Sequence, residues 1–278
     1  MGIEDSDLPA LLDRVAEVFG ARIDELFGLV ETVHRRITQI IDGLAERNRM
    51  PDRAALAAVR PLLHELLATD QPLLEGFDMA VSPNTLSDAD RWLECWRRDS
   101  DGNSYFVKHV LNPDSVGFYD YQSRDWFNAP IAAGHAVATG PYIDSGGIDV
   151  CTITLGIPLV ASTGGTAVIG ADLCIAGLEA LLLRTVQTRR HQVVVLAGNE
   201  RVVVSNSARH VTGSRLRLNG SERIERSVPV RSQDPRRLPW RVVGLSTAAD
   251  RPARSGEVSA RAVTGPTSDA GVTGGPAG

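Results

Sequence analysis

The sequence predicts an α+β fold in which one long N-terminal helix supports a larger antiparallel sheet and a smaller second sheet. Apolar residues recur every three or four positions between residues 8 and 44, which is typical of a long amphipathic helix. After residue 72 the chain turns to short apolar runs broken by Gly, Pro, Asn and Asp, as in strands joined by turns. From residue 192 a second group of short apolar runs leaves little room for helices.

The long helix follows from one regular set of apolar positions. These are Leu8, Leu12, Val15, Phe19, Ile23, Leu26, Val30, Val33, Ile37, Ile40 and Leu44. An extra step of four interrupts a seven-residue repeat, so the apolar stripe could form a coiled coil with a partner helix. It could equally pack against its own chain.

A second helix should follow a short break. The segment 48–51 (N-R-M-P) ends the first helix, and Pro51 is well placed to open another that runs to Leu67. Pro61 should kink or restart this helix, because proline lacks the backbone N–H that a helix interior needs.

The larger sheet is predicted from four apolar runs, at 74–81, 105–111, 150–160 and 167–172, with a helix at 173–186 after them. Residues 87–97 are expected to form a short helix, with Trp92 and Trp96 on one face covering an edge of the sheet. Gly164-Gly165 is interpreted as a hairpin turn, since no Gly-Lys-Ser/Thr follows to make a phosphate loop.

The smaller sheet is predicted at 192–197, 201–205, 224–230 and 240–245. Beyond residue 246 almost no large apolar residue occurs, and a disordered tail is expected. The predicted division is therefore 1–70 (helical), 71–186 (larger sheet), 187–246 (smaller sheet) and 247–278 (tail).

Composition excludes several classes. A net charge of −5 with mixed signs gives no basic face, so no nucleic-acid partner is expected. The three cysteines are too scattered for a disulfide framework or a metal site, and no cofactor is expected. The acidic N-terminus lacks a secretory signal and no apolar run is long enough to span a membrane, so we expect a cytoplasmic protein.

The stretch 117–144 gathers most of the residues that could bind a small ligand. A guanidinium at Arg124 can bind a carboxylate, Trp126 and Tyr142 offer flat walls, and aspartates can accept from an ammonium group. Alternatively, Arg124 forms an internal salt bridge to Asp120, Asp125 or Asp144. The aromatic and acidic residues would then serve core packing or turn capping.

No catalytic pattern stands out. The six histidines are dispersed, and neither a zinc-protease spacing nor a nucleophile-elbow sequence occurs. Only His135 is close in sequence to the candidate pocket. We therefore expect a binding protein that is not an enzyme.

Three segments in order carry a resemblance to a known family: Y-D-x-x-x-R-x-W-[Y/F] from Tyr119, G-P-Y-x-D ending at Asp144, and G-A-D ending at Asp172. These segments and the order of elements over residues 8–245 resemble the double Cache sensor domains of bacterial chemoreceptors and sensor kinases. The resemblance implies two PAS-like sheets on a long helix, with the ligand bound by the larger sheet. It implies these ligand-binding residues: Tyr119, Arg124, Trp126, Phe127, Tyr142, Asp144 and Asp172.

The resemblance implies a sensor in signal transduction that binds a small amino acid or amine, with Arg and Trp on the carboxylate and Tyr and Asp on the amino group. Phe127 stands where the family often has Tyr. Cache domains usually sit between two membrane-spanning helices, whereas this sequence has no apolar run long enough to form one. We therefore expect a free-standing relative that signals through a homodimer of its N-terminal helix or through a partner. The alternatives are a dimerising adaptor with a vestigial pocket, and an enzyme acting on a small carboxylate.

Overall fold

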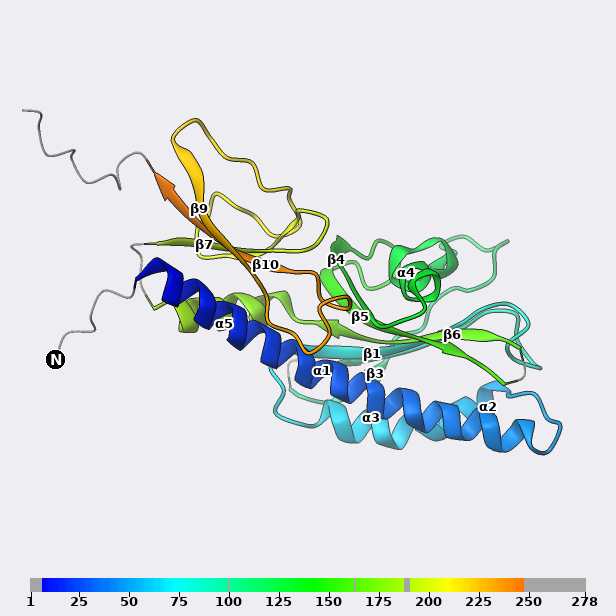
Figure 1. The fold of residues 1–278 in the computed structure, drawn as a ribbon. Coiled ribbons are helices and arrows are strands. Elements are labelled where there is room, and N and C mark those ends of the chain that lie inside the picture. The colour runs from blue at the N-terminus through cyan, green and yellow to red at the C-terminus, as the bar shows by residue number, and fades with distance from the viewer. Residues whose placement is uncertain (1–6, 100, 163, 188–190, 248–278) are drawn as a thin grey trace, which may run out of the picture.

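The structure is a computed structural model, which describes residues 7–99, 101–162, 164–187 and 191–247. The predicted disordered tail therefore lies almost wholly outside the described residues. A long helix runs beneath two sheets that follow each other along its length (Figure 1). This is the predicted α+β architecture.

Helix α1 (Leu8–Ala45) confirms the predicted long helix and contacts strands of both sheets. Its apolar stripe is buried within the chain itself, at Leu11, Leu12, Val15, Phe19, Ile23, Leu26, Val30, Val33 and Ile37. Burial of such a stripe is what stabilises an amphipathic helix of this length. The stripe thus packs on its own chain, and a helix partner would have to use another face.

The second helical region is broken as predicted. It consists of α2 (Arg53–Leu56), a 3₁₀ turn η1 (Ala57–Val59) and α3 (Arg60–Leu67). Pro61 lies in the first turn of α3, where its missing N–H leaves no helical hydrogen bond unmade. The side chain of Asp52 accepts from the Ala55 N–H and caps α2.

The larger sheet has six antiparallel strands in the order β3-β2-β1-β6-β5-β4. The strands are β1 (Leu74–Val81), β2 (Trp92–Arg98), β3 (Ser104–Phe106), β4 (Val137–Ile143), β5 (Cys151–Val160) and β6 (Thr166–Leu173). One face packs against α1, and the other face carries the 3₁₀ turn η2 (Tyr121–Ser123) and helix α4 (Asp125–Ala133). The predicted strand at 105–111 is shorter than expected.

The short helix predicted at 87–97 is wrong, because these residues form strand β2, paired with β1 and β3. Residues four apart share a face in a strand as well as in a helix, since side chains alternate along a strand. Trp92 and Trp96 therefore still lie on one face, with Glu94 between them. The buried Glu94 carboxylate accepts from both indole N–H groups, at 3.2 and 2.7 Å, and from the Arg60 guanidinium at 2.6 Å.

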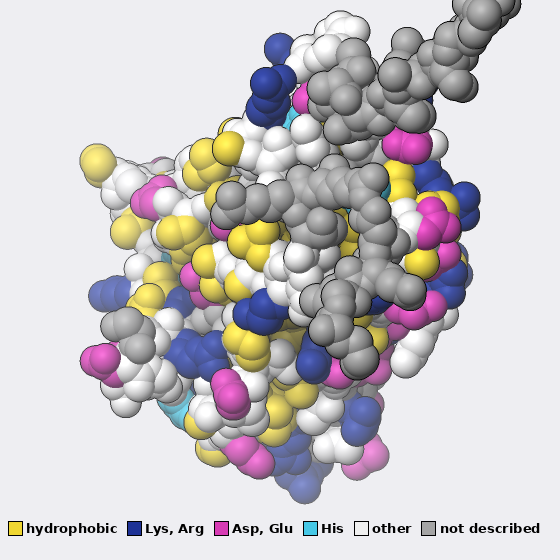
Figure 2. Space-filling model, turned by 90° about the vertical axis from the view of Figure 1, so that its left-hand side faces the viewer, with side chains coloured by type: hydrophobic (Ala, Val, Ile, Leu, Met, Phe, Trp, Pro, Cys, Tyr) yellow, Lys and Arg dark blue, Asp and Glu magenta, His cyan; other side chains and the backbone are white. Residues whose placement is uncertain are grey.

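Helix α5 (Ile175–Val186) leads to the smaller sheet, whose strand order is β8-β7-β10-β9. Its strands are β7 (Gln192–Leu196), β8 (Val202–Ser205), β9 (Glu222–Pro229) and β10 (Arg241–Thr247). All four predicted strands are confirmed. Figure 2 shows basic and acidic side chains interspersed over this end of the molecule.

The segment between β9 and β10 links three parts of the fold. Arg237 lies within it, and its guanidinium donates to Asp24 at 2.8 Å and to Glu31 at 3.0 Å, both on α1. The same guanidinium lies 4.5 Å from the ring centroid of Phe27. The backbone oxygen of Arg237 accepts from the Ala138 N–H of β4 at 2.9 Å. The larger sheet, the segment before β10 and α1 are thereby joined at one residue.

Helix α1 also touches this segment backbone to backbone at Gly20. A Cβ at Gly20 would lie 2.0 Å from the backbone oxygen of Arg231, whereas a Cβ at Gly28 would meet nothing within 4 Å. Gly20 is therefore required by the close approach, while Gly28 is not.

None of the described helices has an apolar stretch long enough to cross a membrane.

We expect Gly20→Ala to lower the free energy of unfolding by about 1–3 kcal/mol, because the helix must move away from Arg231. Gly28→Ala, the matched control, should raise it by about 0.5–1 kcal/mol through the lower entropy of the unfolded chain. Denaturant unfolding followed by circular dichroism measures both. Equal stability of the two variants would show that α1 does not depend on this contact.

Candidate functional site

A row of facing residues crosses four strands of the larger sheet. Arg97 on β2 is opposite Gly76 on β1, Gly76 is opposite Asp172 on β6, and Asp172 is opposite Thr154 on β5. Such cross-strand neighbours lie close enough to interact. The Arg97 Nη2 donates to Asp172 Oδ2, and the Thr154 hydroxyl donates to Asp172 Oδ1.

Gly76 makes this contact possible. A Cβ at Gly76 would lie 2.5 Å from Cδ and 2.8 Å from Nη1 of Arg97. The arginine side chain therefore passes over Gly76 to reach Asp172 two strands away. Both charged side chains are buried, each 4% exposed as a residue.

This ion pair lines a small polar space, here called the inner cavity, of about 10 Å³. A volume of this size holds about one water molecule. Its lining includes Asp78, Cys95, Arg97, His109, Tyr119, Trp126, Tyr142, Asp144, Thr154 and Asp172. Tyr142 extends the polar network, because its hydroxyl lies 2.7 Å from Thr154 Oγ1.

Asp144 is held by the chain from two sides. Its Oδ1 accepts from the Tyr119 hydroxyl at 2.6 Å, and its Oδ2 accepts from the Ile148 N–H at 3.2 Å. The Trp126 indole N–H in turn donates to the Tyr119 oxygen at 3.2 Å. Burial raises the pKa of Asp144, although the hydrogen bond from Tyr119 opposes that shift. Asp144 thus has the turn-capping role considered as an alternative.

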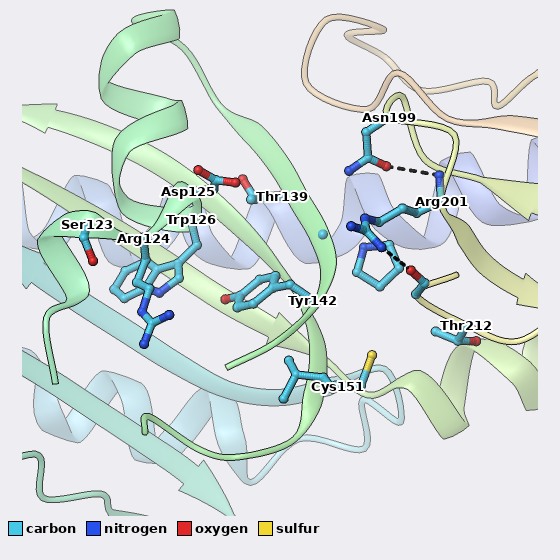
Figure 3. A pocket seen from close by; sticks show the side chains of 14 residues that line it. Ser123, Arg124, Asp125, Trp126, Thr139, Tyr142, Cys151, Asn199, Arg201 and Thr212 are labelled. Atoms are coloured by element: carbon cyan, nitrogen blue, oxygen red, sulfur yellow. Dashed lines mark hydrogen bonds between the residues drawn. The ribbon is translucent and has the colours of Figure 1, made fainter. Parts of the chain in front are cut away.

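A larger space, here called the outer pocket, has helix α4 and strand β4 on one side and the turn between β7 and β8 on the other (Figure 3). Its volume is about 620 Å³, within the range of sites for small molecules. Its lining includes Ser123, Arg124, Asp125, Trp126, Thr139, Tyr142, Cys151, Asn199, Arg201 and Thr212.

Arg124 belongs to the outer pocket and forms no ion pair with a carboxylate of the described residues. Its Nη2 donates to the Ser145 carbonyl at 2.7 Å, and its guanidinium lies 5.4 Å from the centroid of the Tyr119 ring. The structure describes all three aspartates considered as alternatives, and none forms an ion pair with Arg124; Asp120 pairs instead with Arg91 at 3.1 Å. The guanidinium therefore keeps donors for a ligand.

The structure separates Arg124 and Asp172, which the resemblance to double Cache domains assigns to the carboxylate and the amino group of one ligand. Arg124 lines the outer pocket and Asp172 lines the inner cavity, while Trp126 and Tyr142 line both and form the wall between them. The reason is that Asp172 turns toward Arg97 at the centre of the sheet, whereas Arg124 precedes α4 near the edge strand β4.

The other predicted residues divide in the same way. Tyr119 and Asp144 line the inner cavity. Phe127 lines neither space, because its ring packs in the core 5.4 Å from the Tyr121 ring. His135 also lines neither space; its Nδ1 lies 2.8 Å from the Ala136 oxygen.

Three residues that line these spaces were not predicted from the sequence: Arg97, Asp78 and Arg201. Arg97 was missed because residues 87–97 were expected to form a helix. Side chains alternate along a strand, so a strand at this place puts Cys95 and Arg97 on the face opposite Glu94. Asp78 follows the same alternation on β1. Arg201 reaches the outer pocket from the smaller sheet, where its Nη1 donates to the Gly213 carbonyl at 2.5 Å.

The electrostatics of the inner cavity are dominated by burial. Burial raises the pKa of Asp78 well above its usual range, and the nearby Asp172 carboxylate raises it further. For Arg97 burial acts in the opposite direction, but Asp172 and Asp78 outweigh it and raise the pKa. Arg97 therefore keeps its charge, and Asp78 is the group that resists ionisation. Among the described residues, no three His, Cys, Asp or Glu side chains gather closely enough to hold a metal ion.

We expect Asp78→Asn to stabilise the protein more at pH 7 than at pH 4. A carboxyl whose pKa is raised in the folded state costs stability as pH rises from its unfolded value, near 3.8, through its folded value, and asparagine does not ionise. Chemical unfolding at several pH values measures the difference in unfolding free energy from the unmodified protein.

Asp88→Asn is the control of opposite sign. The hydrogen bond from Arg53 lowers the pKa of Asp88, so its contribution to stability is present at pH 7 and is lost as the carboxylate is protonated at low pH. Asp88→Asn should therefore destabilise at pH 7 and approach neutrality as the pH falls through the lowered pKa of Asp88. A pH-independent effect of Asp78→Asn would contradict the assignment of Asp78.

Comparison with known proteins supports the same architecture. Residues 93–180 match the family model described as "Methyl-accepting chemotaxis protein-like, first PDC sensor domain". No curated protein sequence matches the chain.

Solved structures extend the similarity over most of the chain. A methyl-accepting chemotaxis protein X matches with a TM-score of 0.59 and 15% identity, covering 87% of this chain and 100% of that one. The ligand-binding domain of the Pseudomonas aeruginosa amino acid chemoreceptor PctB, in complex with L-Arg, matches at 0.57 with 15% identity over 87% and 94%. The ligand-binding domain of the Pseudomonas fluorescens chemoreceptor CtaA, in complex with L-valine, matches at 0.54 with 16% identity over 87% and 96%. The resemblance to double Cache sensor domains, which belong to the PDC type, is thereby confirmed for the fold.

Proposed function

From its double Cache fold, we propose that this chain is a ligand-binding sensor module for a small metabolite of amino-acid size: an amino acid, an amine or a small carboxylate. The observation that carries the proposal is the outer pocket of about 620 Å³, in which Arg124 lies beside the wall of Trp126 and Tyr142. The solved relatives in complex with L-Arg and L-valine support this class of ligand.

Arg124 is proposed to bind a carboxylate. A guanidinium presents paired N–H donors that match the two oxygens of a carboxylate, and the Arg124 Nε is buried without a hydrogen-bond partner among the described residues. Trp126 and Tyr142 would cover the apolar part of the ligand. Two or three charge-assisted hydrogen bonds at roughly 1.5–3 kcal/mol each contribute about 3–9 kcal/mol before the cost of immobilising the ligand is subtracted. Micromolar binding requires about 8 kcal/mol net, so it also needs a fourth polar contact or burial of the ligand against Trp126 and Tyr142.

The adaptor function is the second candidate, and the closed inner cavity favours it. A space of about 10 Å³ cannot admit a metabolite without movement of its lining, such as Trp126 or Tyr142, which favours a vestigial inner cavity. In both cases the signal would pass to a partner or through a homodimer of α1. Light scattering at high protein concentration tests the dimer, and a monomer would exclude it.

Three further expectations are proposals of the same kind. We propose that the chain has no catalytic activity, that it divides at residues 70, 186 and 246, and that it is cytoplasmic. Turnover of a bound ligand would contradict the first, limited proteolysis tests the second, and cell fractionation tests the third.

We expect a thermal-shift screen of amino acids, amines and small organic acids to find at least one stabilising compound. Arg124→Ala should weaken the binding of any carboxylate-bearing compound by roughly tenfold or more, since one charge-assisted hydrogen bond contributes at least about 1.5 kcal/mol. Isothermal titration calorimetry measures the dissociation constants.

Arg91→Ala is the matched control. Arg91 also lies near the site and forms an ion pair, with Asp120, but it lines neither the inner cavity nor the outer pocket. Its loss should leave binding unchanged. Absence of any stabilising compound would favour the adaptor function, and an equal loss in both variants would remove Arg124 from the site.

A further inference from the structure

The acidic end of the inner cavity already holds a cation supplied by the chain. The buried Arg97 guanidinium donates to one oxygen of Asp172, and the Thr154 hydroxyl donates to the other. Carboxylate oxygens of this kind are the strongest acceptors for a ligand ammonium group, because the hydrogen bond is charge-assisted. At Asp172 it would therefore have to displace Arg97.

The second buried aspartate of the G-P-Y-x-D turn is no more available. Asp144 accepts from Tyr119 and from the Ile148 N–H. In the outer pocket the remaining carboxylate is Asp125, which is exposed, and an exposed ion pair contributes little. A ligand ammonium in the outer pocket thus meets no buried carboxylate there. In the inner cavity Asp144 and Asp172 already accept hydrogen bonds, and the raised pKa of Asp78 disfavours its charged form.

The inner cavity nevertheless has the chemistry of a cation site. Its lining carries three carboxyl groups, of Asp78, Asp144 and Asp172, and one guanidinium. Arg97 is held there through a single nitrogen: its Nε and Nη1 are buried without hydrogen-bond partners among the described residues. The guanidinium is therefore not locked by a bidentate pair, and an equivalent cation could take its place.

We propose that Arg97 is a specificity-determining residue, whose guanidinium fills the cation site at Asp172 and so restricts the sensor to small carboxylates that carry no ammonium group. The inference rests on the proposed function of ligand binding. It depends on Gly76, which leaves the path from β2 to β6 open.

The first experiment uses the unmodified protein and ligands matched in carbon skeleton. The trios are acetate, glycine and methylamine; propionate, alanine and ethylamine; and butyrate, 4-aminobutyrate and propylamine. Calorimetry at one pH and ionic strength should find that the carboxylate of the best trio binds on the order of tenfold or more tightly than its amino-acid counterpart, and that the amine does not bind. Tighter binding of an amino acid or amine that disappears in Asp172→Asn would overturn the inference, because ammonium then reaches Asp172.

The second experiment replaces the tethered cation. Arg97→Ala should melt at a lower temperature than the unmodified protein, since it leaves buried carboxylates unpaired. Methylguanidinium or ethylamine should restore the melting temperature at concentrations that leave the unmodified protein unchanged. The ligand preference should also move toward the amino acid. The double variant Arg97→Ala/Asp172→Asn should show no rescue, because the carboxylate that binds the added cation is gone.

Arg98→Ala is the matched control on the same strand. The Arg98 guanidinium lies outside both spaces and donates to the carbonyls of Gln71 and Leu74, each at 2.8 Å. Its loss should lower stability without rescue and without a change in ligand preference. If Arg97→Ala does not fold, the matched trios with Asp172→Asn still decide the question. If the protein binds ligands but prefers those with an ammonium group, the inference is wrong and the proposed function stands. If it binds no ligand of any trio, both are wrong.

Discussion

The buried ion pair of Arg97 and Asp172 is the interaction on which the site depends. Two charges removed from water are tolerated only when each finds a partner, and loss of one partner of such a pair typically costs about 3–5 kcal/mol. The pair exists because three strands hold a fixed register, with Gly76 between the two charged residues. The ion pair therefore depends on both the strand register and the lack of a side chain at Gly76. The polarity of the inner cavity depends in turn on the ion pair.

Trp126 and Tyr142 divide the site into two spaces with different chemistry. The inner cavity is acidic, small and already neutralised in part by Arg97, whereas the outer pocket is large and contains the guanidinium groups of Arg124 and Arg201. A pocket bounded by both sheets brings residues of the smaller sheet into contact with whatever occupies it. The smaller sheet is therefore part of the site as well as part of the scaffold.

Much of the fold could be predicted from the sequence, because its signals are local. The apolar repeat defines α1, and short apolar runs bounded by turn residues define the strands on either side of α5. Strand β2 was missed since the spacing of Trp92 and Trp96 fits a helix and a strand equally. That error concealed Arg97, whose role depends on register with β1 and β6, and register between strands distant in sequence has no local signal. Motif residues such as Arg124 and Asp172 could be identified, but which side of the aromatic wall each occupies depends on side-chain packing.

Arg237 gives the fold a mechanical property. Its backbone oxygen accepts a hydrogen bond from β4, the strand that carries Tyr142. Its nearly buried guanidinium donates to Asp24 and Glu31 of α1 and lies over the Phe27 ring. A displacement of β4 cannot be absorbed by a loose loop at this point, because the linking residue is fixed at both ends. It must break the backbone hydrogen bond to Arg237, break a charge-assisted contact to α1, or carry the long helix with it. A shift of the pocket wall that preserves these contacts therefore moves the element that both sheets share.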